Sequence, residues 1–136
     1  MKLLLALSTV LIGSASHAAI AMNYGCTDGQ GTQISWELRP NSEGDKMDRL
    51  HRDINISFND VTRSLSEGKL VVGKKASISL WNPDTGESVV VKAKKLIKDN
   101  GDEQVYSGKA DFLIKTVDGL ELRRSVKVTC SVFGEA

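Results

Sequence analysis

Two cysteines, Cys26 and Cys130, lie near the two ends of the 136-residue chain and are its only cysteines. The chain begins with a segment typical of an export signal, and exported proteins mature in an oxidising space where thiols pair. A bond between the two would close a loop of about a hundred residues, worth roughly 4 to 5 kcal/mol in the chain-entropy view. The pair therefore predicts a structural disulfide that ties the first structured segment to the last.

Residues 1–18 predict a secretory signal peptide. Lys2 supplies a short positive region, an apolar run follows over residues 3–13, and small residues precede Ala18. We expect cleavage after Ala18, with cleavage after Ala21 as the alternative. The apolar run is too short for a permanent membrane anchor, so no transmembrane segment is expected. The very short positive region looks bacterial, and the predicted destination is the periplasm or the exterior.

The remaining residues, 19–136, form one domain of ordinary size by this prediction. Loss of Lys2 from the 18 basic residues leaves them equal in number to the 17 acidic ones. A balanced chain lacks the overall field of a protein that binds nucleic acid or membrane surfaces without specificity. We expect no nucleic-acid partner and a monomer.

Strict alternation of apolar and polar residues dominates this domain and predicts strands with one buried face. Turn signals such as Asp28-Gly29 and Asp118-Gly119 separate the strands, so neighbours in sequence should pair as an antiparallel meander. The predicted apolar rows, about eight in number, lie at residues 22–26, 34–38, 54–58, 70–72, 76–80, 89–93, 106–114 and 122–132.

So many strands in a domain of this size favour a sheet that closes, or nearly closes, into a β-barrel, with a β-sandwich as the alternative. Cys26 falls in the apolar row of the first strand and Cys130 in that of the last. Closure would bring these two strands together, so the disulfide is expected to join them. Residues 61–72 are ambiguous, because Val61 and Leu65 suit one helical turn and residues 70–72 suit a short strand.

No catalytic or metal-binding constellation stands out. His51 is the only histidine left after signal removal, and no nucleophile motif accompanies it. A single histidine and two bonded cysteines supply too few ligands for zinc. The acidic clusters at residues 43–48 and 99–103 lie in turns, and no acidic residue interrupts an apolar row as a buried general acid would. We therefore expect a protein that is not an enzyme, with no cofactor and no metal.

Five residues are the predicted partner-binding candidates. Trp81 is out of phase with its apolar row and directly precedes a turn, so it either covers the end of the barrel or anchors a partner. Asn82 and Asp84 belong to that turn, in a loop over residues 81–87. Lys92 and Lys94 begin a lysine-rich outer face, which suits either a plain solvated surface or an anionic partner.

The opening stretch Tyr24-Gly25-Cys26-Thr27-Asp28-Gly29, followed by Ile34-Ser35-Trp36, resembles the start of periplasmic inhibitors of C-type lysozyme. Those are small exported β-barrels, so the resemblance implies the same fold and, as an alternative function, lysozyme inhibition. No functional residue carries over, because the loop residues that enter the lysozyme cleft have no counterpart here.

Three functions follow as expectations. The first is an exported, non-enzymatic binding protein that presents the loops at residues 40–48 and 81–87 to a protein or glycan. The second is a periplasmic protein that acts like a lysozyme inhibitor. The third is an envelope-associated structural protein that uses its lysine-rich face.

Overall fold

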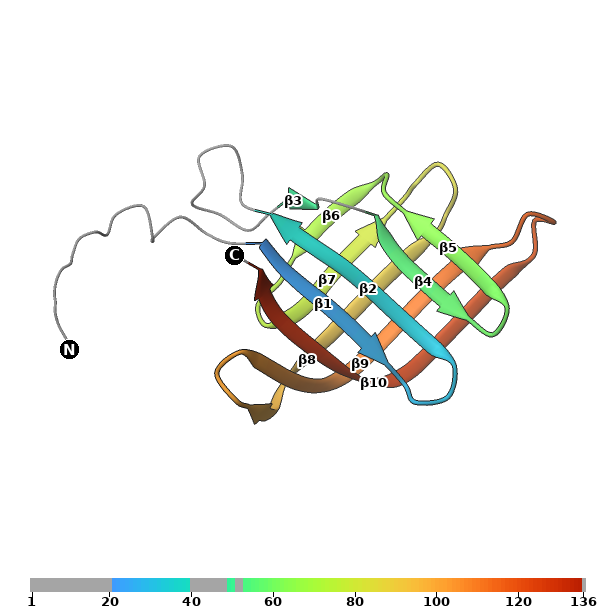
Figure 1. Cartoon of the computed structure of the whole chain (residues 1–136). Coiled ribbons are helices and arrows are strands. Elements are labelled where there is room, and N and C mark those ends of the chain that lie inside the picture. The colour runs from blue at the N-terminus through green and yellow to red at the C-terminus, as the bar shows by residue number, and fades with distance from the viewer. Residues whose placement is uncertain (1–20, 40–48, 51–52, 136) are drawn as a thin grey trace, which may run out of the picture.

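The computed structural model describes residues 21–39, 49–50 and 53–135 (Figure 1). These residues form an all-β structure, as predicted. Its strands are β1 (Ala21–Thr27), β2 (Thr32–Arg39), β3 (Arg49–Leu50), β4 (Ile54–Phe58), β5 (Val61–Leu65), β6 (Lys69–Val72), β7 (Ala76–Trp81), β8 (Ser88–Asp99), β9 (Glu103–Lys115) and β10 (Glu121–Glu135). The predicted signal peptide, the loop at residues 40–48 and His51 lie outside the described residues.

All of these strands belong to one antiparallel sheet, in the order β5-β4-β2-β1-β10-β9-β8-β7-β6, with β3 paired to β2. The meander is therefore confirmed, and the sheet curls into a half-barrel (Figure 1). The described strands exceed the expected number because β3 and β5 are not among the expected rows, and residues 61–65 form a strand and not a helical turn. Val61, Arg63 and Leu65 alternate with polar residues, which is the pattern of a strand.

The pairing of the first and last strands is confirmed, but the sheet opens elsewhere. β1 and β10 are hydrogen-bonded neighbours in the middle of the sheet, whereas its two edges are β5 and β6, which follow one another in sequence. Gly68, between them, has a φ of +126°, and a Cβ there would lie 2.2 Å from the carbonyl oxygen of Trp81. The turn therefore packs against the end of β7, so that β6 pairs with β7 instead of folding back on β5.

The inner face of the curl carries the apolar core. Most residues of the predicted rows are buried, including Ile34, Trp36 and Leu38 on β2, and others, such as Leu70 and Val72, are partly buried against them. Across the interior, Phe58 meets Phe112 edge to face at 6.2 Å between ring centroids. Alternation thus separates a dry inner face from a polar outer face, as expected for a sheet with one side buried.

The disulfide between Cys26 and Cys130 lies within this core. The two residues are directly opposite in the β1–β10 register, with their Cα atoms 4.0 Å apart. Both side chains are buried. The bond therefore fastens the pair of strands that joins the two ends of the chain.

Gly108 gives a test of how closely β8 and β9 approach each other. A Cβ on Gly108 would lie 2.0 Å from the backbone oxygen of Lys92 and 2.4 Å from the Cα of Ala93. Replacing Gly108 by alanine should therefore lower the free energy of unfolding by about 3 kcal/mol, as overpacking against backbone does. Urea denaturation monitored by tryptophan fluorescence measures this change.

The matched control is Gly25→Ala in β1, where a Cβ meets no atom within 4 Å. This variant should change the free energy of unfolding by less than about 1 kcal/mol. Equal losses in the two variants would contradict the close approach at Gly108.

Candidate functional site

Three lysines form a row across the outer face of the longest strands. Alternation places Lys92, Lys109 and Lys127 outward on β8, β9 and β10, and all three are exposed. The register sets Lys92 opposite Lys109 and Lys109 opposite Lys127. Neighbouring strands lie about 4.8 Å apart, so three like charges stand at the closest spacing a sheet allows. Such pairs destabilise a sheet, so this arrangement works against the fold.

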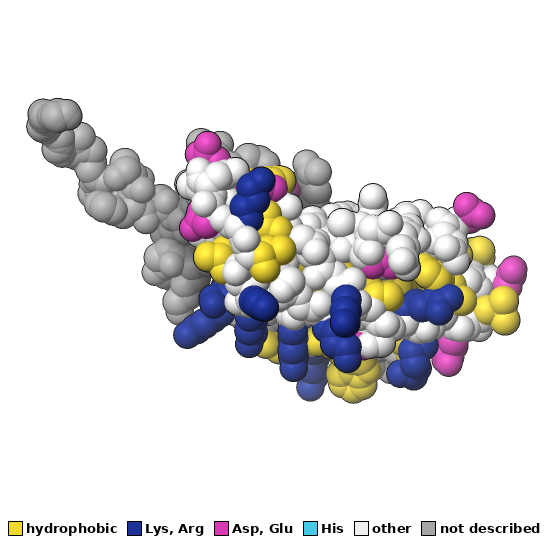
Figure 2. Space-filling model, turned by 90° about the horizontal axis from the view of Figure 1, so that it is seen from below, with side chains coloured by type: hydrophobic (Ala, Val, Ile, Leu, Met, Phe, Trp, Pro, Cys, Tyr) yellow, Lys and Arg dark blue, Asp and Glu magenta, His cyan; other side chains and the backbone are white. Residues whose placement is uncertain are grey.

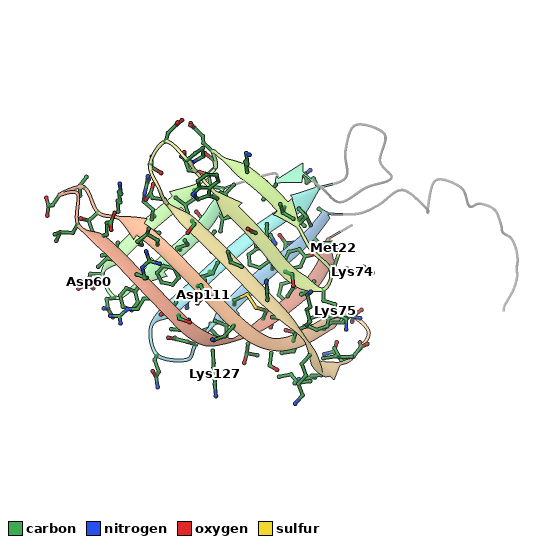
Figure 3. All side chains as sticks on the ribbon, turned by 180° about the vertical axis from the view of Figure 1, so that it is seen from behind. Met22, Asp60, Lys74, Lys75, Asp111 and Lys127 are labelled. Atoms are coloured by element: carbon green, nitrogen blue, oxygen red, sulfur yellow. A yellow bond between two sulfur atoms is a disulfide. The ribbon has the colours of Figure 1, made fainter. Side chains whose placement is uncertain are left out.

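The same face carries further cations around this lysine row. Figure 2 shows Lys and Arg side chains gathered along this side of the molecule. Lys95, Lys98 and Arg123 are exposed. The acidic residues at outward positions of the paired β8–β10 region include Asp111, Glu103 and Glu121, and they are fewer than the cations. Lys127 points away from the sheet into solvent (Figure 3). The surface is therefore positive even though the chain as a whole is nearly neutral.

Lys94, the other predicted lysine, occupies an irregular position. The β8–β9 register shifts between Ala93 and Lys95, which leaves Lys94 as the extra residue of a bulge. It is exposed, and its backbone oxygen accepts a hydrogen bond from Lys75 Nζ at 3.2 Å. Lys92 and Lys94 therefore lie on one surface, as predicted, and both line a small hollow on it.

An open groove of about 550 Å³ borders the lysine row on the β1 side. Lys109 and Lys127 line it together with the β1–β2 turn. In that turn Asp28 accepts hydrogen bonds from the backbone N–H groups of Gln30 at 2.7 Å and Thr32 at 3.0 Å. These hydrogen bonds, of which the one from Gln30 has the largest effect, lower the pKa of Asp28. Its ionised carboxylate therefore stabilises the turn.

Trp81 lies on the same outer face as the lysine row. Its side chain is 47% exposed and its register partners are Lys69 and Ser88. The ring is therefore half-exposed on the outer face and is not part of the apolar core. Trp81 pairs four residues along β8 from Lys92, a distance of about 13 Å along a strand.

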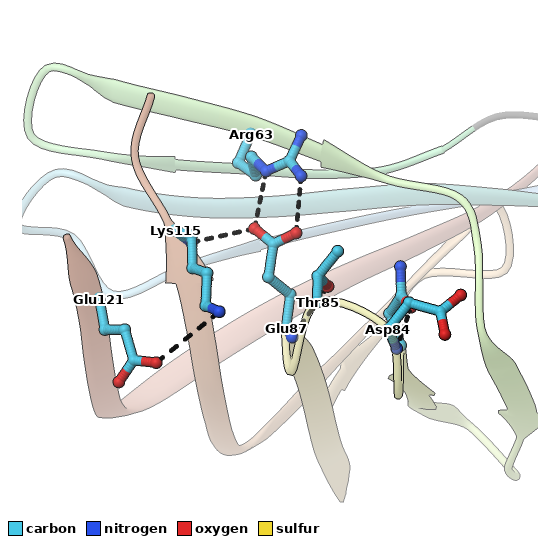
Figure 4. A network of polar contacts seen from close by, with 7 residues as sticks. Arg63, Asp84, Thr85, Glu87, Lys115 and Glu121 are labelled. Atoms are coloured by element: carbon cyan, nitrogen blue, oxygen red, sulfur yellow. Dashed lines mark hydrogen bonds and ion pairs between the residues drawn. The ribbon is translucent and has the colours of Figure 1, made fainter. Parts of the chain in front are cut away.

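Asn82 and Asp84 do not join the lysine row. Asn82 holds the β7–β8 turn: its Oδ1 accepts the N–H of Asp84 at 2.9 Å, and its backbone oxygen accepts the N–H of Gly86 at 2.8 Å. The Asp84 carboxylate points away from the polar network nearby (Figure 4). The structure thus separates the predicted turn residues from the predicted lysines.

The expectation that no acidic residue enters the apolar rows is wrong. Glu87 continues the row of Val89 and Val91, and it is only 1% exposed. It is buried because Arg63, on edge strand β5, pairs with it twice: Nε reaches Oε2 at 2.7 Å and Nη2 reaches Oε1 at 2.6 Å (Figure 4). The backbone N–H of Lys115 donates to Oε2 at 2.9 Å. Glu37 on β2 is also buried.

The ion pair between Arg63 and Glu87 connects edge strand β5 to the β7–β8 turn and to the end of β9. β5 has no backbone pairing with these strands. The hydrogen bonds from Arg63 and Lys115 outweigh burial and lower the pKa of Glu87. A carboxylate held in its ionised form is a poor proton donor, and its lone pairs are engaged. Glu87 therefore has a structural role. With Arg63 and the backbone N–H of Lys115 it forms a clasp between β5, the β7–β8 turn and β9.

Sequence reasoning missed the clasp and the geometry of the lysine row. Lys109 and Lys127 are visible in the sequence as outward residues of separate strands, but only the register puts them beside Lys92. Arg63 at an inward position of the row Val61, Arg63 and Leu65 is the one signal that could have pointed to a buried acidic partner.

In the described part of the chain, no group of three or more His, Cys, Asp or Glu residues could hold a metal ion. No helix in that part has the length and apolar character needed to cross a membrane. Comparison with protein-family models gives no match, and neither curated proteins nor solved structures match the chain. Function is therefore inferred from the residues of this chain.

Glu87→Gln tests the clasp. The variant keeps the side-chain shape and removes the charge that Arg63 binds, and it should lose about 2 kcal/mol of unfolding free energy at pH 7. The matched control is Glu121→Gln, because Glu121 is exposed and its carboxylate lies 3.9 Å from Lys115 Nζ. That change should cost less than about 0.5 kcal/mol.

The effect of Glu87→Gln should depend on pH. Since the pKa of Glu87 is lowered on folding, its stabilisation is fully present above the ordinary glutamate value of 4.5 and disappears as pH falls through the folded-state pKa. The difference between native and variant proteins should therefore shrink on acidification, measured by urea denaturation at pH 7 and in steps below pH 4. A constant difference over this range would contradict the assignment.

Proposed function

We propose that this chain is an exported, non-enzymatic binding protein that holds an anionic macromolecule, an acidic protein or an acidic glycan, on the outer face of β8–β10. The observation that carries the proposal is the lysine row, because Lys92, Lys109 and Lys127 stand directly opposite one another. Repulsion within the row is relieved when carboxylate, sulfate or phosphate groups bind between the ammonium groups. Binding of an anion at the lysine row is thus favourable, whereas the row by itself does not stabilise the fold.

Two neighbouring features fit the same surface. The groove beside Lys109 and Lys127 gives a partner a concave place to lie. Trp81 supplies a half-exposed aromatic ring of the kind enriched at the energetic centres of interfaces. Cations give attraction and orientation, whereas an aromatic anchor gives contact area.

An oxidising compartment reached by export suits this chain. The disulfide between Cys26 and Cys130 is typical of proteins that mature in an oxidising space. The signal features at residues 1–18 support the same proposal. An exported bacterial protein meets anionic envelope polymers and acidic secreted proteins, which are the partners proposed here.

The loop-presenting alternative has one observation in its favour. Trp81 lies at the start of a turn in which the N–H of Asn82 donates to the oxygen of Glu87 and the N–H of Gly86 donates to the oxygen of Asn82, so it is displayed on a rigid support. Such a display suits insertion into a cleft of a protein partner. Inhibition of C-type lysozyme stays a prediction of the resemblance in the opening strand.

Lys109→Glu tests the lysine row with a stability readout as a second signature. The variant should bind dextran sulfate or polyglutamate at least fivefold more weakly, because the central charge of the row is reversed. It should also unfold at equal or higher denaturant concentration, since an acidic residue between two lysines replaces repulsion by attraction. Titration at low and moderate salt, with urea denaturation, measures both.

The control for Lys109→Glu is Arg39→Glu, at an exposed arginine at the end of β2. It changes the net charge equally but lies off the lysine row, so it should weaken binding by less than twofold. Equal losses in the two variants would mean that only net charge matters, and the proposal would then be wrong.

Trp81→Ala separates the two uses of this face. If Trp81 anchors a partner, the variant should bind the polyanions at least threefold more weakly while its melting temperature changes by less than about 2 °C, because a half-exposed side chain contributes little to the core. Thermal melts and the same titrations measure this. A large loss of thermal stability would instead place the ring among the residues that hold the fold.

A further inference from the structure

The outer edge of β6 is an unpaired strand edge. β6 ends the sheet, and among the described strands only β7 pairs with it. The backbone N–H of Gly73 donates to the oxygen of Ser77 at 3.0 Å, which makes this a hydrogen-bonded pair of the β6–β7 ladder. Such pairs recur at every second residue of an antiparallel ladder. Val71 therefore bonds toward β7, whereas Leu70 and Val72 direct their N–H and C=O groups away from it.

This edge has two of the features that protect natural sheet edges, a length of four residues and a lysine, Lys69, but it lacks the others. It holds no proline, and its register with β7 is regular over Lys69–Val72. Val71 is 63% exposed on the outer face, and Leu70 and Val72 pack half-buried at the rim of the core. A regular, apolar, unpaired edge is a template for another strand.

The charges around β6 favour an acidic occupant. Lys69 lies at its start, and Lys74 and Lys75 follow its end, close together in Figure 3. Glu67 is the acidic residue that precedes the strand. A second copy of this chain, paired antiparallel through β6, would bring these lysines near their own counterparts, whereas an acidic segment would neutralise them.

We propose that β6 binds an extended segment of an acidic partner protein by strand addition. The segment pairs with the outward N–H and C=O groups of Leu70 and Val72, places apolar side chains inward beside these two residues, and places acidic side chains near Lys69, Lys74 and Lys75. Main-chain hydrogen bonds give affinity, and the alternating side chains give specificity. This site lies on a different strand from the lysine row and is independent of the function proposed above.

The test selects peptides from a phage-displayed library of random twelve-residue sequences on the full chain. Enriched peptides should alternate apolar residues and carry acidic residues toward their ends. They should bind Val72→Pro at least tenfold more weakly, because proline removes an N–H that points away from β7 and is tolerated at such edge positions. Val72→Ala, which keeps that N–H, should bind within threefold of the native protein.

A second measurement does not depend on the folding of Val72→Pro. Methylating alternate backbone nitrogens of a selected peptide blocks strand pairing and should abolish its binding to the native protein. Hydrogen exchange at the amides of Leu70 and Val72 should slow at least tenfold when the unmodified peptide is bound.

Several outcomes would overturn the proposal. These are the absence of enriched peptides, equal binding to native protein and Val72→Pro, binding that survives backbone methylation, or sedimentation showing that β6 instead pairs two copies of this chain. Lys109→Glu should leave peptide binding unchanged, and Val72→Pro should leave polyanion binding unchanged, so failure of one proposal is distinguishable from failure of the other.

Discussion

The pairing of β1 with β10 is the contact on which the rest of this structure depends. Through it, the strands that begin and end the domain become neighbours, and a meander that would otherwise have two remote ends forms one continuous sheet. The disulfide from Cys26 to Cys130 fastens this pair within the core. Because it closes a long loop, it removes much of the entropy that would favour separation of the two ends.

Because β1 pairs with β10, the open edges of the sheet are formed by strands from the middle of the sequence. The edges become β5 and β6, where the backbone offers no closing ladder among the described strands. A side-chain contact, Arg63 with Glu87, takes over part of that task by linking β5 to the β7–β8 turn and to the end of β9. An ion pair is tolerated there because every bond Glu87 makes compensates its loss of water.

The three surface features described here follow from this architecture. The long strands β8, β9 and β10 provide a broad outer face, and their register brings three lysines into one row. The half-barrel leaves β6 unpaired on one side. Trp81, on β7, lies between these two regions, so one side of the molecule carries an exposed tryptophan ring, the lysine row and the unpaired edge of β6.

The sequence by itself determined the all-β class, most strand positions, the buried rows and the disulfide, because alternation and cysteine position are local signals that act within a strand. It also indicated that Trp81 is out of phase with its apolar row and that Lys92 and Lys94 face outward. Only the tertiary structure decided that the sheet opens between β5 and β6, that Glu87 is buried against Arg63, and that Lys109 and Lys127 complete a row with Lys92. These outcomes depend on register and on contacts between residues far apart in the chain, and a pattern with a period of two residues carries no information about which residue of a neighbouring strand stands opposite.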